Sequence, residues 1–370
     1  MLAVGDLSVT TIAGIGGFAV GLIFGGTAQR TQFCTMGAVS DMVLMGDGRR
    51  FRAWILAIAT AMLGSQALHL AGVVDLDKSI YLSANFGWLG AIIGGLMFGY
   101  GMTRAGGCGS RTLVRLGAGN LKSLIVFIVL GLCAYMTLRG IIAVARLRID
   151  AAGTIDLAAR GWPRQGLPDM AAALLGLPAP RVRQGLVTVL AAAMLYYCFA
   201  SAAFRASASD IVAGIVIGAT VTMGWYVTGV VAFDEFQPLP LVSLTFVAPA
   251  GDSLQYLMTF TGSTIGFGVA TVGGVLAGSF LMAQATGTFR VESFTDRDDL
   301  LSHLGGAVFM GVGGVTALGC TIGQGITGMS TLSLGSLLAW LSILAGGVLG
   351  IKALEQGSFI GGLRATLARE

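Results

Sequence analysis

Hydrophobic residues run in long unbroken stretches along this chain, and short polar segments separate them. A stretch that crosses about 30 Å of hydrocarbon as an α-helix needs roughly 20 apolar residues. We find nine candidates, at 9–28, 52–73, 87–105, 121–146, 184–204, 209–231, 262–283, 301–318 and 333–351. Four other segments are too short to cross and too apolar for ordinary loops, and we interpret them as re-entrant half-helices: 35–46, 108–118, 251–260 and 320–330. The pattern predicts an all-α integral membrane protein.

Composition supports this prediction. Hydrophobic residues make up 55% of the 370 positions and charged residues 11%, and the mean hydropathy is +0.83. A soluble domain cannot bury that much apolar surface. The 58 glycines fit closely packed or broken membrane helices. The net charge of +4 is small and the arginines are scattered, so nucleic-acid binding is not indicated.

The N-terminal region and the cysteines further limit the kind of membrane protein that this chain can be. The N-terminal region lacks the basic stretch and cleavage site of a secretory signal, so the first apolar stretch is expected to remain as a spanning helix in the bacterial inner membrane. The five cysteines form no CxxC pair and no cysteine–histidine metal spacing. Neither a disulfide framework, nor a zinc site, nor a cofactor is predicted.

An internal repeat is visible at two Gly-Cys dipeptides. GGLMFGYGMTRAGGC begins at Gly94 and GGAVFMGVGGVTALGC begins at Gly305, and each run precedes a short polar stretch. The two copies follow the third and the eighth predicted spans, so an odd number of crossings separates equivalent points and the repeat is expected to be inverted. Spans one to four then pair with spans six to nine. The expected parts are a first repeat at 1–146, a surface segment with a connector helix at 147–208, and a second repeat at 209–370.

The distribution of basic residues predicts how the chain is oriented. Arginines and lysines follow the first and third spans and lie near the C-terminus, whereas Asp75, Asp77, Asp234 and Glu235 lie between other spans. Because short cytoplasmic loops are enriched in basic residues, we expect a periplasmic N-terminus and a cytoplasmic C-terminus. The segment 147–182 is the one sizeable piece between spans. It is expected to lie on the membrane surface, with partner docking as the alternative.

Three cysteines share one setting, in which a span ends and a short polar helix begins: Cys34, Cys108 and Cys320. The first turn of a helix has unpaired backbone N–H groups and a positive dipole end, and both favour an anion. The adjacent Gly107, Gly109 and Gly319 would let a ligand reach the backbone. Thr321, directly after Cys320, belongs to the same candidate site. Cys133 and Cys198 lie within apolar runs and are expected to be packing residues.

The protonation state of these thiols decides what they can do. A thiolate would repel an incoming anion, whereas a neutral thiol is a weak hydrogen-bond donor. We therefore expect a transported anion to meet protonated thiols in series. Arg111 could attract the anion at the pore mouth or serve as a membrane anchor, and Gln324 could donate to the anion or cap a helix.

Five motifs together resemble the YeeE/YedE sulfur-transport family: FCTMGAVSDM from Phe33, AGGCGSRTLVRLGAGNLKS from Ala105, TFVAPAGDSLQYL from Thr245, GTFRVE from Gly287, and GCTIGQGITGMSTLSLGSLLA from Gly319. The resemblance implies an inner-membrane uptake protein for thiosulfate with an hourglass-like interior, in which cysteine thiols relay the ion inward. By motif match the relay falls on Cys34, Cys108 and Cys320, with Cys108 at its centre. The resemblance also implies a small cytoplasmic TusA-like sulfur-carrier protein as a partner.

Several alternatives stay open at this stage. The cargo could be another sulfur or selenium species. The chain could instead be a membrane enzyme that passes electrons or a persulfide between cysteines, although such enzymes usually have a CxxC pair. A channel without thiol chemistry would tolerate serine in place of cysteine, whereas a thiol relay would not. The chain has no nucleotide-binding loop, so direct use of ATP is not expected.

Overall fold

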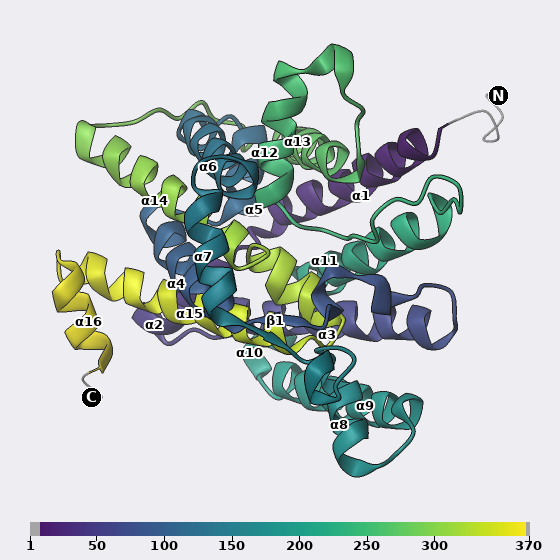
Figure 1. Ribbon diagram of the computed structural model, residues 1–370. Coiled ribbons are helices and arrows are strands. Elements are labelled where there is room, and N and C mark those ends of the chain that lie inside the picture. Colours follow the sequence, from purple (N-terminus) through teal and green to yellow (C-terminus); the bar gives the residue numbers. More distant parts are fainter. Residues whose placement is uncertain (1–7, 368–370) are drawn as a thin grey trace.

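The computed structural model describes residues 8–367 and is mostly helical (Figure 1). Its helices are α1 (Val9–Thr31), α2 (Thr35–Met45), α3 (Arg49–Leu70), η2 (Leu76–Lys78), η3 (Ile80–Leu82), α4 (Trp88–Arg104), α5 (Gly109–Gly117), α6 (Leu121–Arg139), α7 (Ala143–Gly153), η4 (Ala158–Arg160), α8 (Leu167–Leu175), α9 (Ala179–Phe199), α10 (Ala202–Arg205), α11 (Ala208–Tyr226), η5 (Val227–Val231), α12 (Val247–Met258), η6 (Phe260–Gly262), α13 (Phe267–Ala285), α14 (Arg297–Thr316), η7 (Gly323–Gly328), α15 (Leu334–Glu355) and α16 (Phe359–Leu367). The two strands are β1 (Asn85–Gly87) and β2 (Thr154–Asp156).

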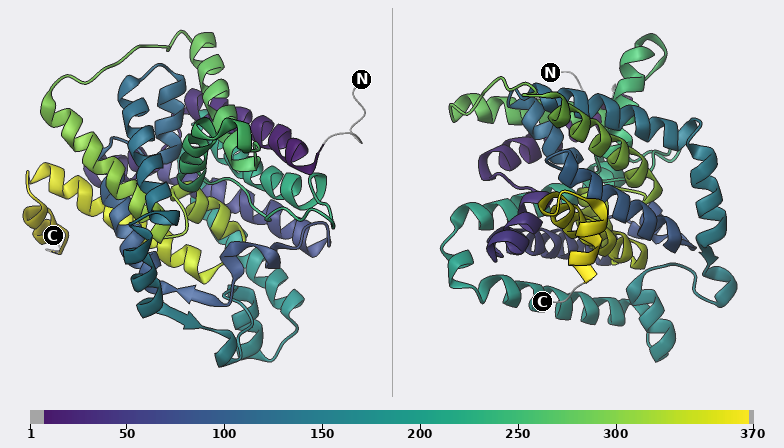
Figure 2. Two further views of the ribbon diagram at one scale, coloured as in Figure 1. Left: turned by 45° about the horizontal axis from the view of Figure 1, so that its top comes forward. Right: turned by 90° about the vertical axis from the view of Figure 1, so that its left-hand side faces the viewer.

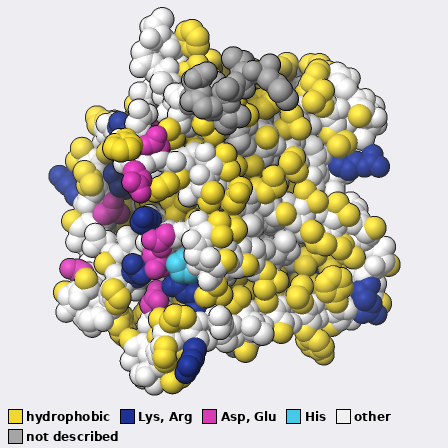
Figure 3. Space-filling view, turned by 90° about the vertical axis from the view of Figure 1, so that its right-hand side faces the viewer, with side chains coloured by type: hydrophobic (Ala, Val, Ile, Leu, Met, Phe, Trp, Pro, Cys, Tyr) yellow, Lys and Arg dark blue, Asp and Glu magenta, His cyan; other side chains and the backbone are white. Residues whose placement is uncertain are grey.

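A long helix covers most of each predicted span, and seven segments in the described part of the chain are long and apolar enough to cross a membrane. The helices α4, with 17 residues, and α14, which begins Arg-Asp-Asp, are not among the seven. Figure 3 shows one face on which hydrophobic side chains cover the middle and charged side chains gather at the margins. The fold is therefore that of a helical membrane protein, and the count of nine crossings stays a prediction.

The long helices form one bundle in which helices far apart in sequence are neighbours (Figures 1 and 2). The main contacts pair α1 with α13, α3 with α11, α4 with α14 and α15, and α6 with α14. Glycines make these close approaches possible, as where α4 crosses α14. A Cβ atom on Gly94 would lie 2.5 Å from the backbone nitrogen of Ala317 and 2.6 Å from the carbonyl oxygen of Gly313. Only a residue without a side chain fits at this crossing.

Short helices occupy the positions of the four predicted half-helices. Three of them are α2, α5 and α12, and the fourth spans 321–330 and contains the π-helix η7. The helix α12 begins at Val247, four residues before the predicted start at 251. Its first turn contains Pro249, which lacks a backbone N–H and is tolerated there because the first helical N–H groups have no intrahelical partner.

Two features of the fold differ from the expected spans. The span predicted at 121–146 is two helices, because α6 ends at Arg139 and α7 begins at Ala143 after Gly140, whose backbone is extended. The segment 147–182 also contains a strand that the apolar pattern did not predict. In it, β2 pairs antiparallel with β1, so that Phe86 lies opposite Ile155. This pairing ties the segment to the connection between α3 and α4.

Candidate functional site

The three predicted cysteines share one backbone geometry. In each case the residue two positions before the cysteine is left-handed, and the next N–H donates to a carbonyl five residues earlier, which closes the preceding long helix. The left-handed residues are Gln32 (φ 54°), Gly106 (φ 68°) and Leu318 (φ 59°). The closing hydrogen bonds are Phe33 to Ala28 at 3.3 Å, Gly107 to Met102 at 2.9 Å and Gly319 to Gly314 at 2.8 Å. The same turn is thus built three times, although glycine is at the left-handed position in only one copy.

Each cysteine then precedes the first turn of a short helix. The Sγ atom of Cys34 accepts from the N–H of Gly37 at 3.5 Å, and that of Cys320 accepts from the N–H of Gly323 at 3.4 Å. The Sγ atom of Cys108 lies 3.3 Å from the hydroxyl oxygen of Ser110. The thiols therefore sit where the N–H groups of the first turns have no partner within the helix and the helix dipoles are positive.

The three thiols differ in how deeply they are buried in the bundle. Cys108 and Cys320 are 1% and 0% exposed, and Cys34 is partly buried. The side chain of Arg111, three residues after Cys108, donates to Gln32, which lies two residues before Cys34. Near Cys320, a Cβ on Gly323 would lie 3.6 Å from the hydroxyl oxygen of Tyr81, and the N–H of Gly323 donates to the Cys320 thiol. A series in which Cys108 lies between the other two stays a prediction.

Several buried polar atoms beside the thiols have no hydrogen-bond partner within residues 8–367. They are Thr35 Oγ1, Arg111 Nη1, Thr321 Oγ1 and Gln324 Oε1. Such atoms are costly unless a ligand or water pairs with them. Thr321 and Gln324 were predicted from the sequence, whereas Thr35 was missed. The repeated dipeptide Cys-Thr, at Cys34-Thr35 and Cys320-Thr321, is the signal that would have found it.

Two cavities are lined by predicted site residues, and we name them the outer and the inner cavity after the predicted orientation. The outer cavity, with a volume of about 30 Å³, is where α4 begins and α14 ends, and Tyr81, Gln165 and Gln324 line it. The inner cavity, with a volume of about 320 Å³, is beside the connection between α5 and α6, and Arg111 and Arg115 line it. Figure 2 shows the same bundle from two further directions. A continuous polar route between the two cavities stays a prediction.

Arg111 lines the inner cavity and Gln324 lines the outer cavity. Arg111 Nη2 donates to Oε1 of Gln32, and Gln324 Nε2 donates to the carbonyl oxygen of Ala317 at 2.6 Å. Two glycines make room for these side chains. A Cβ on Gly107 would lie 2.9 Å from Cγ of Arg111, and one on Gly319 would lie 3.2 Å from Cγ of Gln324. Gly109 has more room, since its nearest neighbours would be 3.8 Å away. Contact between a ligand and these glycines stays a prediction.

The two remaining cysteines have packing environments, as expected. Cys133 faces the α6–α14 contact, where a Cβ on Gly311 would lie 2.8 Å from the Cβ of Cys133. Cys198 is 0% exposed, and its Sγ donates to the carbonyl oxygen of Arg52 at 3.2 Å. Neither residue opens a short helix.

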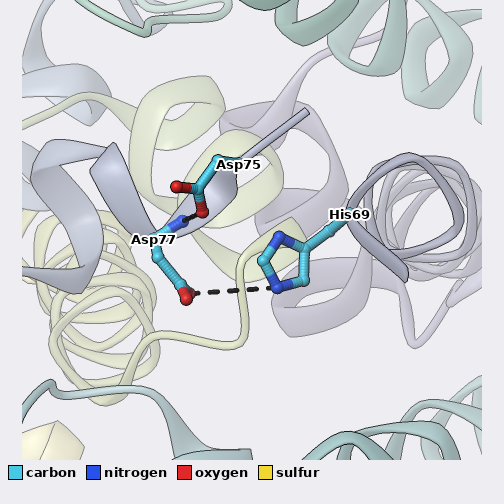
Figure 4. A group of neighbouring side chains, drawn as sticks. All are labelled: His69, Asp75 and Asp77. Atoms are coloured by element: carbon cyan, nitrogen blue, oxygen red, sulfur yellow. Dashed lines mark hydrogen bonds and ion pairs between the residues drawn. The ribbon is translucent and has the colours of Figure 1, made fainter. Parts of the chain in front are cut away.

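Figure 4 shows His69, Asp75 and Asp77, whose ligand atoms lie within 4.8 Å of one another. This spacing would suit a metal ion, but the surrounding charges do not. Nδ1 of His69 accepts from the N–H of Leu76 at 3.2 Å. The Asp77 carboxylate is bound by two guanidinium groups, Arg164 at 2.5 Å and Arg183 at 3.4 Å, which would repel a cation. The cluster therefore joins the α3–α4 connection to the segment 147–182.

Several apolar spans around buried polar groups are typical of a multi-pass membrane transporter. The family model described as sulphur transport matches residues 30–349, and the chain belongs to this family. It is a family of transporters, not of enzymes, and the chain is a multi-pass inner-membrane protein.

Named relatives cover most of the chain. It is 28% identical over 325 residues to the thiosulfate transporter TsuA of Escherichia coli K12, a match that covers 84% of this chain and 86% of the relative. It is 25% identical over 343 residues to the TsuA of Spirochaeta thermophila, covering 89% and 96%. A shorter match, 33% identical over 104 residues, links it to the probable transporter YedE of E. coli K12 and covers 28% of this chain and 24% of that one.

Proposed function

We propose that this chain takes up thiosulfate across the bacterial inner membrane, and that the ion passes the thiols of Cys320, Cys108 and Cys34 in that order. The observation that carries the proposal is the series of three helix-opening cysteines in the interior of the bundle. The two relatives that cover most of the chain are thiosulfate transporters, which supports the same cargo here.

The chemistry of the ion suits this route. The terminal sulfur of thiosulfate is large, polarizable and a weak hydrogen-bond acceptor, so it matches neutral S–H donors better than the hard oxygens of sulfate do. The N-terminal dipoles of the short helices stabilise its negative charge. The hydroxyl groups of Thr35 and Thr321 supply further donors. Because each contact is weak, the ion can leave each thiol for the next, as conduction requires.

The packing of the bundle supports an inverted repeat with the site between its halves. Each helix of one half can be exchanged with one helix of the other half. The exchange maps α1, α2 and α3 onto α11, α12 and α13 in that order, and α4, α5 and α6 onto α14, η7 and α15. The main contacts between helices are unchanged by it. The pair α1–α13 becomes α11–α3, the pair α4–α15 becomes α14–α6, and α5–α13 becomes η7–α3. We therefore keep the parts 1–146, 147–208 and 209–370, with re-entrant short helices and an hourglass-like interior narrowest at Cys108.

Orientation and partner belong to the same proposal. The start of α1 and the end of α15 lie at opposite ends of the bundle (Figure 1). This supports termini on opposite sides of the membrane, and the basic residues near the C-terminus favour the cytoplasm for that end. The arginine-lined inner cavity then faces the cytoplasm, where a small TusA-like sulfur-carrier protein would receive the ion.

The test is uptake of radiolabelled thiosulfate into cells whose only route is this protein. Three chains are compared at matched membrane levels: the native chain, Cys108→Ser, and the control Cys133→Ser. Serine keeps the size but replaces a soft donor with a hard one, so we expect Cys108→Ser to lose at least about tenfold in uptake, the equivalent of one hydrogen bond. The control is expected to retain uptake.

The outcomes separate the parts of the proposal. Equal uptake by Cys108→Ser and Cys133→Ser would exclude the thiol route and move selectivity to backbone N–H groups. No uptake by the native chain would exclude thiosulfate as the cargo and leave another sulfur or selenium species. Equal transport of sulfate and thiosulfate would remove the argument from the soft terminal sulfur.

A further inference from the structure

The inner cavity carries more positive charge than the thiol route requires. Three arginines line it, Arg111 and Arg115 from α5 and Arg290 from the connection between α13 and α14, and a single carboxylate, that of Glu292, also lines it. The outer cavity is lined by uncharged side chains, among them Tyr81. The two ends of the route therefore differ in electrostatic potential.

The arginine charges are mostly uncompensated. Arg115 Nη2 lies 3.9 Å from Oε2 of Glu292, an oxygen that also accepts from Asn120 Nδ2 at 2.5 Å. For Arg111 and Arg290, no carboxylate of residues 8–367 lies within 4.0 Å. Nη1 of Arg111 is also buried without a partner. Arg290 is exposed, whereas the guanidinium of Arg111 is partly buried without a counter-charge, which is unfavourable, and a bound anion would remove that cost.

The connection that carries Arg290 is held in place by backbone hydrogen bonds. The N–H of Arg290 donates to the carbonyl oxygen of Ala118 at 3.1 Å, and the N–H of Leu121 donates to that of Glu292 at 2.8 Å. Gly119, at φ +100°, allows this contact, because a Cβ there would lie 2.6 Å from the carbonyl oxygen of Arg290. The backbone at Arg290 is thus set before any ligand arrives, and preorganised positions lose less entropy on binding.

We infer that the inner cavity is a second anion site, which binds a small divalent oxyanion after it has left Cys34. Gln32 accepts from Arg111 in the inner cavity and also lines a small neighbouring cavity together with Cys34, so the inner cavity adjoins the proposed thiol route. Guanidinium groups bind the oxygen atoms of an oxyanion through charge-assisted hydrogen bonds and do not need a soft sulfur. The site therefore accepts sulfate as well as thiosulfate, and selection between them occurs earlier, at the thiols. The inference rests on the proposed function for the identity of the transported ion and for the order in which the ion passes the thiols.

Sulfate is the probe that separates this site from the thiols. Binding of radiolabelled sulfate to the purified full-length chain is measured by equilibrium dialysis in a neutral detergent, at constant ionic strength set with chloride. Arg290→Gln is expected to weaken binding about tenfold, because one charge-assisted hydrogen bond is lost. The control Arg297→Gln changes an exposed arginine that follows the same connection but does not line the cavity. It is expected to bind like the native chain, and so is Cys108→Ser.

Each result decides one point. Absence of sulfate binding to the native chain, or equal binding by Arg290→Gln and Arg297→Gln, would overturn the second site. Loss of binding in Cys108→Ser would place the ion at the thiols instead and also overturn it. Phospholipid that co-purifies with the native chain but not with Arg290→Gln would show a lipid headgroup in the cavity, against a site for a free ion. Sulfate binding with no thiosulfate uptake would keep this site and refute the proposed function.

Discussion

Asp77 lies in the connection between α3 and α4, and its ion pairs hold the segment 147–182 and the start of α9 against the bundle. Its carboxylate binds Arg164 at 2.5 Å and Arg183 at 3.4 Å, and Nε2 of His69 lies 4.0 Å away (Figure 4). The side chain of Arg183 is 8% exposed and that of Asp77 is 16% exposed, whereas that of Arg164 is 40% exposed. Asp77→Asn removes the charge but keeps the shape, and we expect it to loosen the segment.

The size of the effect follows from burial. Removing one partner of a fully buried ion pair costs about 3–5 kcal/mol, whereas an exposed pair contributes about 0–1 kcal/mol. Asp77 falls between these limits, because Arg183 keeps a second carboxylate, Asp169, at 3.3 Å, and Arg164 can turn to water. We expect a loss of about 2 kcal/mol in the free energy of unfolding. Asp75→Asn is the matched control. Asp75 is 51% exposed, and its one ion pair is with Lys78 at 3.9 Å, so its loss should stay below about 1 kcal/mol.

Two measurements check this expectation. Thermal unfolding of the detergent-solubilised chain, at one heating rate, should give a lower apparent melting temperature for Asp77→Asn than for Asp75→Asn. Limited trypsin digestion should cut the segment 147–182 faster in Asp77→Asn, because local opening exposes its arginines. Equal melting temperatures and equal cleavage rates in the two variants would refute the role assigned to Asp77.

Three further substitutions test the packing, the route and the pH dependence. Gly94→Val should prevent the close approach of α4 and α14 and lower the free energy of unfolding by about 3 kcal/mol or more. Gly305→Ala is the control, because no atom lies within 4 Å of its new Cβ, and it should be neutral or slightly stabilising. The two variants are compared by melting temperature and by monodispersity on size-exclusion chromatography. Thr321→Val removes a buried hydroxyl without a partner, so we expect unchanged stability with thiosulfate uptake reduced about tenfold, and an unchanged uptake rate would show that the ion does not meet this hydroxyl. The hydrogen bonds from Arg49 hold the pKa of Asp47 below its usual value. They therefore stabilise the fold fully at pH values above the unfolded-state pKa of about 3.9, and this stabilisation is lost as the pH falls through the lower, folded-state pKa. The difference in melting temperature between the native chain and Asp47→Asn should therefore be present at neutral pH and vanish in strong acid, and a difference that persists there would contradict the assignment.

Much of the architecture could be read from the chain alone, because the length of an apolar stretch is set by the thickness of the bilayer. Long helices lie over most of every predicted span, and short helices lie at the four segments that were too short to cross. Cys34, Cys108 and Cys320 stood out because each follows a span and precedes a polar stretch. The break at Gly140 was missed, since the sequence stays apolar through Ile141 and Ile142 and hydropathy does not register a change of direction.

The details of the candidate site depend on contacts between residues far apart in the chain. Glycine is the usual sequence signal for a left-handed residue at a helix end, so this conformation could be predicted for Gly106. Gln32 and Leu318 adopt the same conformation under tertiary constraint and could not be predicted in this way. Arg290 is a lone basic residue in a connecting segment, and it joins Arg111 and Arg115 only because that segment pairs with the connection between α5 and α6. Hydrophobic patterning by itself determined the membrane class, the positions of the helices and the cysteines that open the short ones. Tertiary packing alone decided which helices are neighbours and which charges share a cavity, because these depend on close contacts between segments whose separation along the chain carries no information about their distance in space.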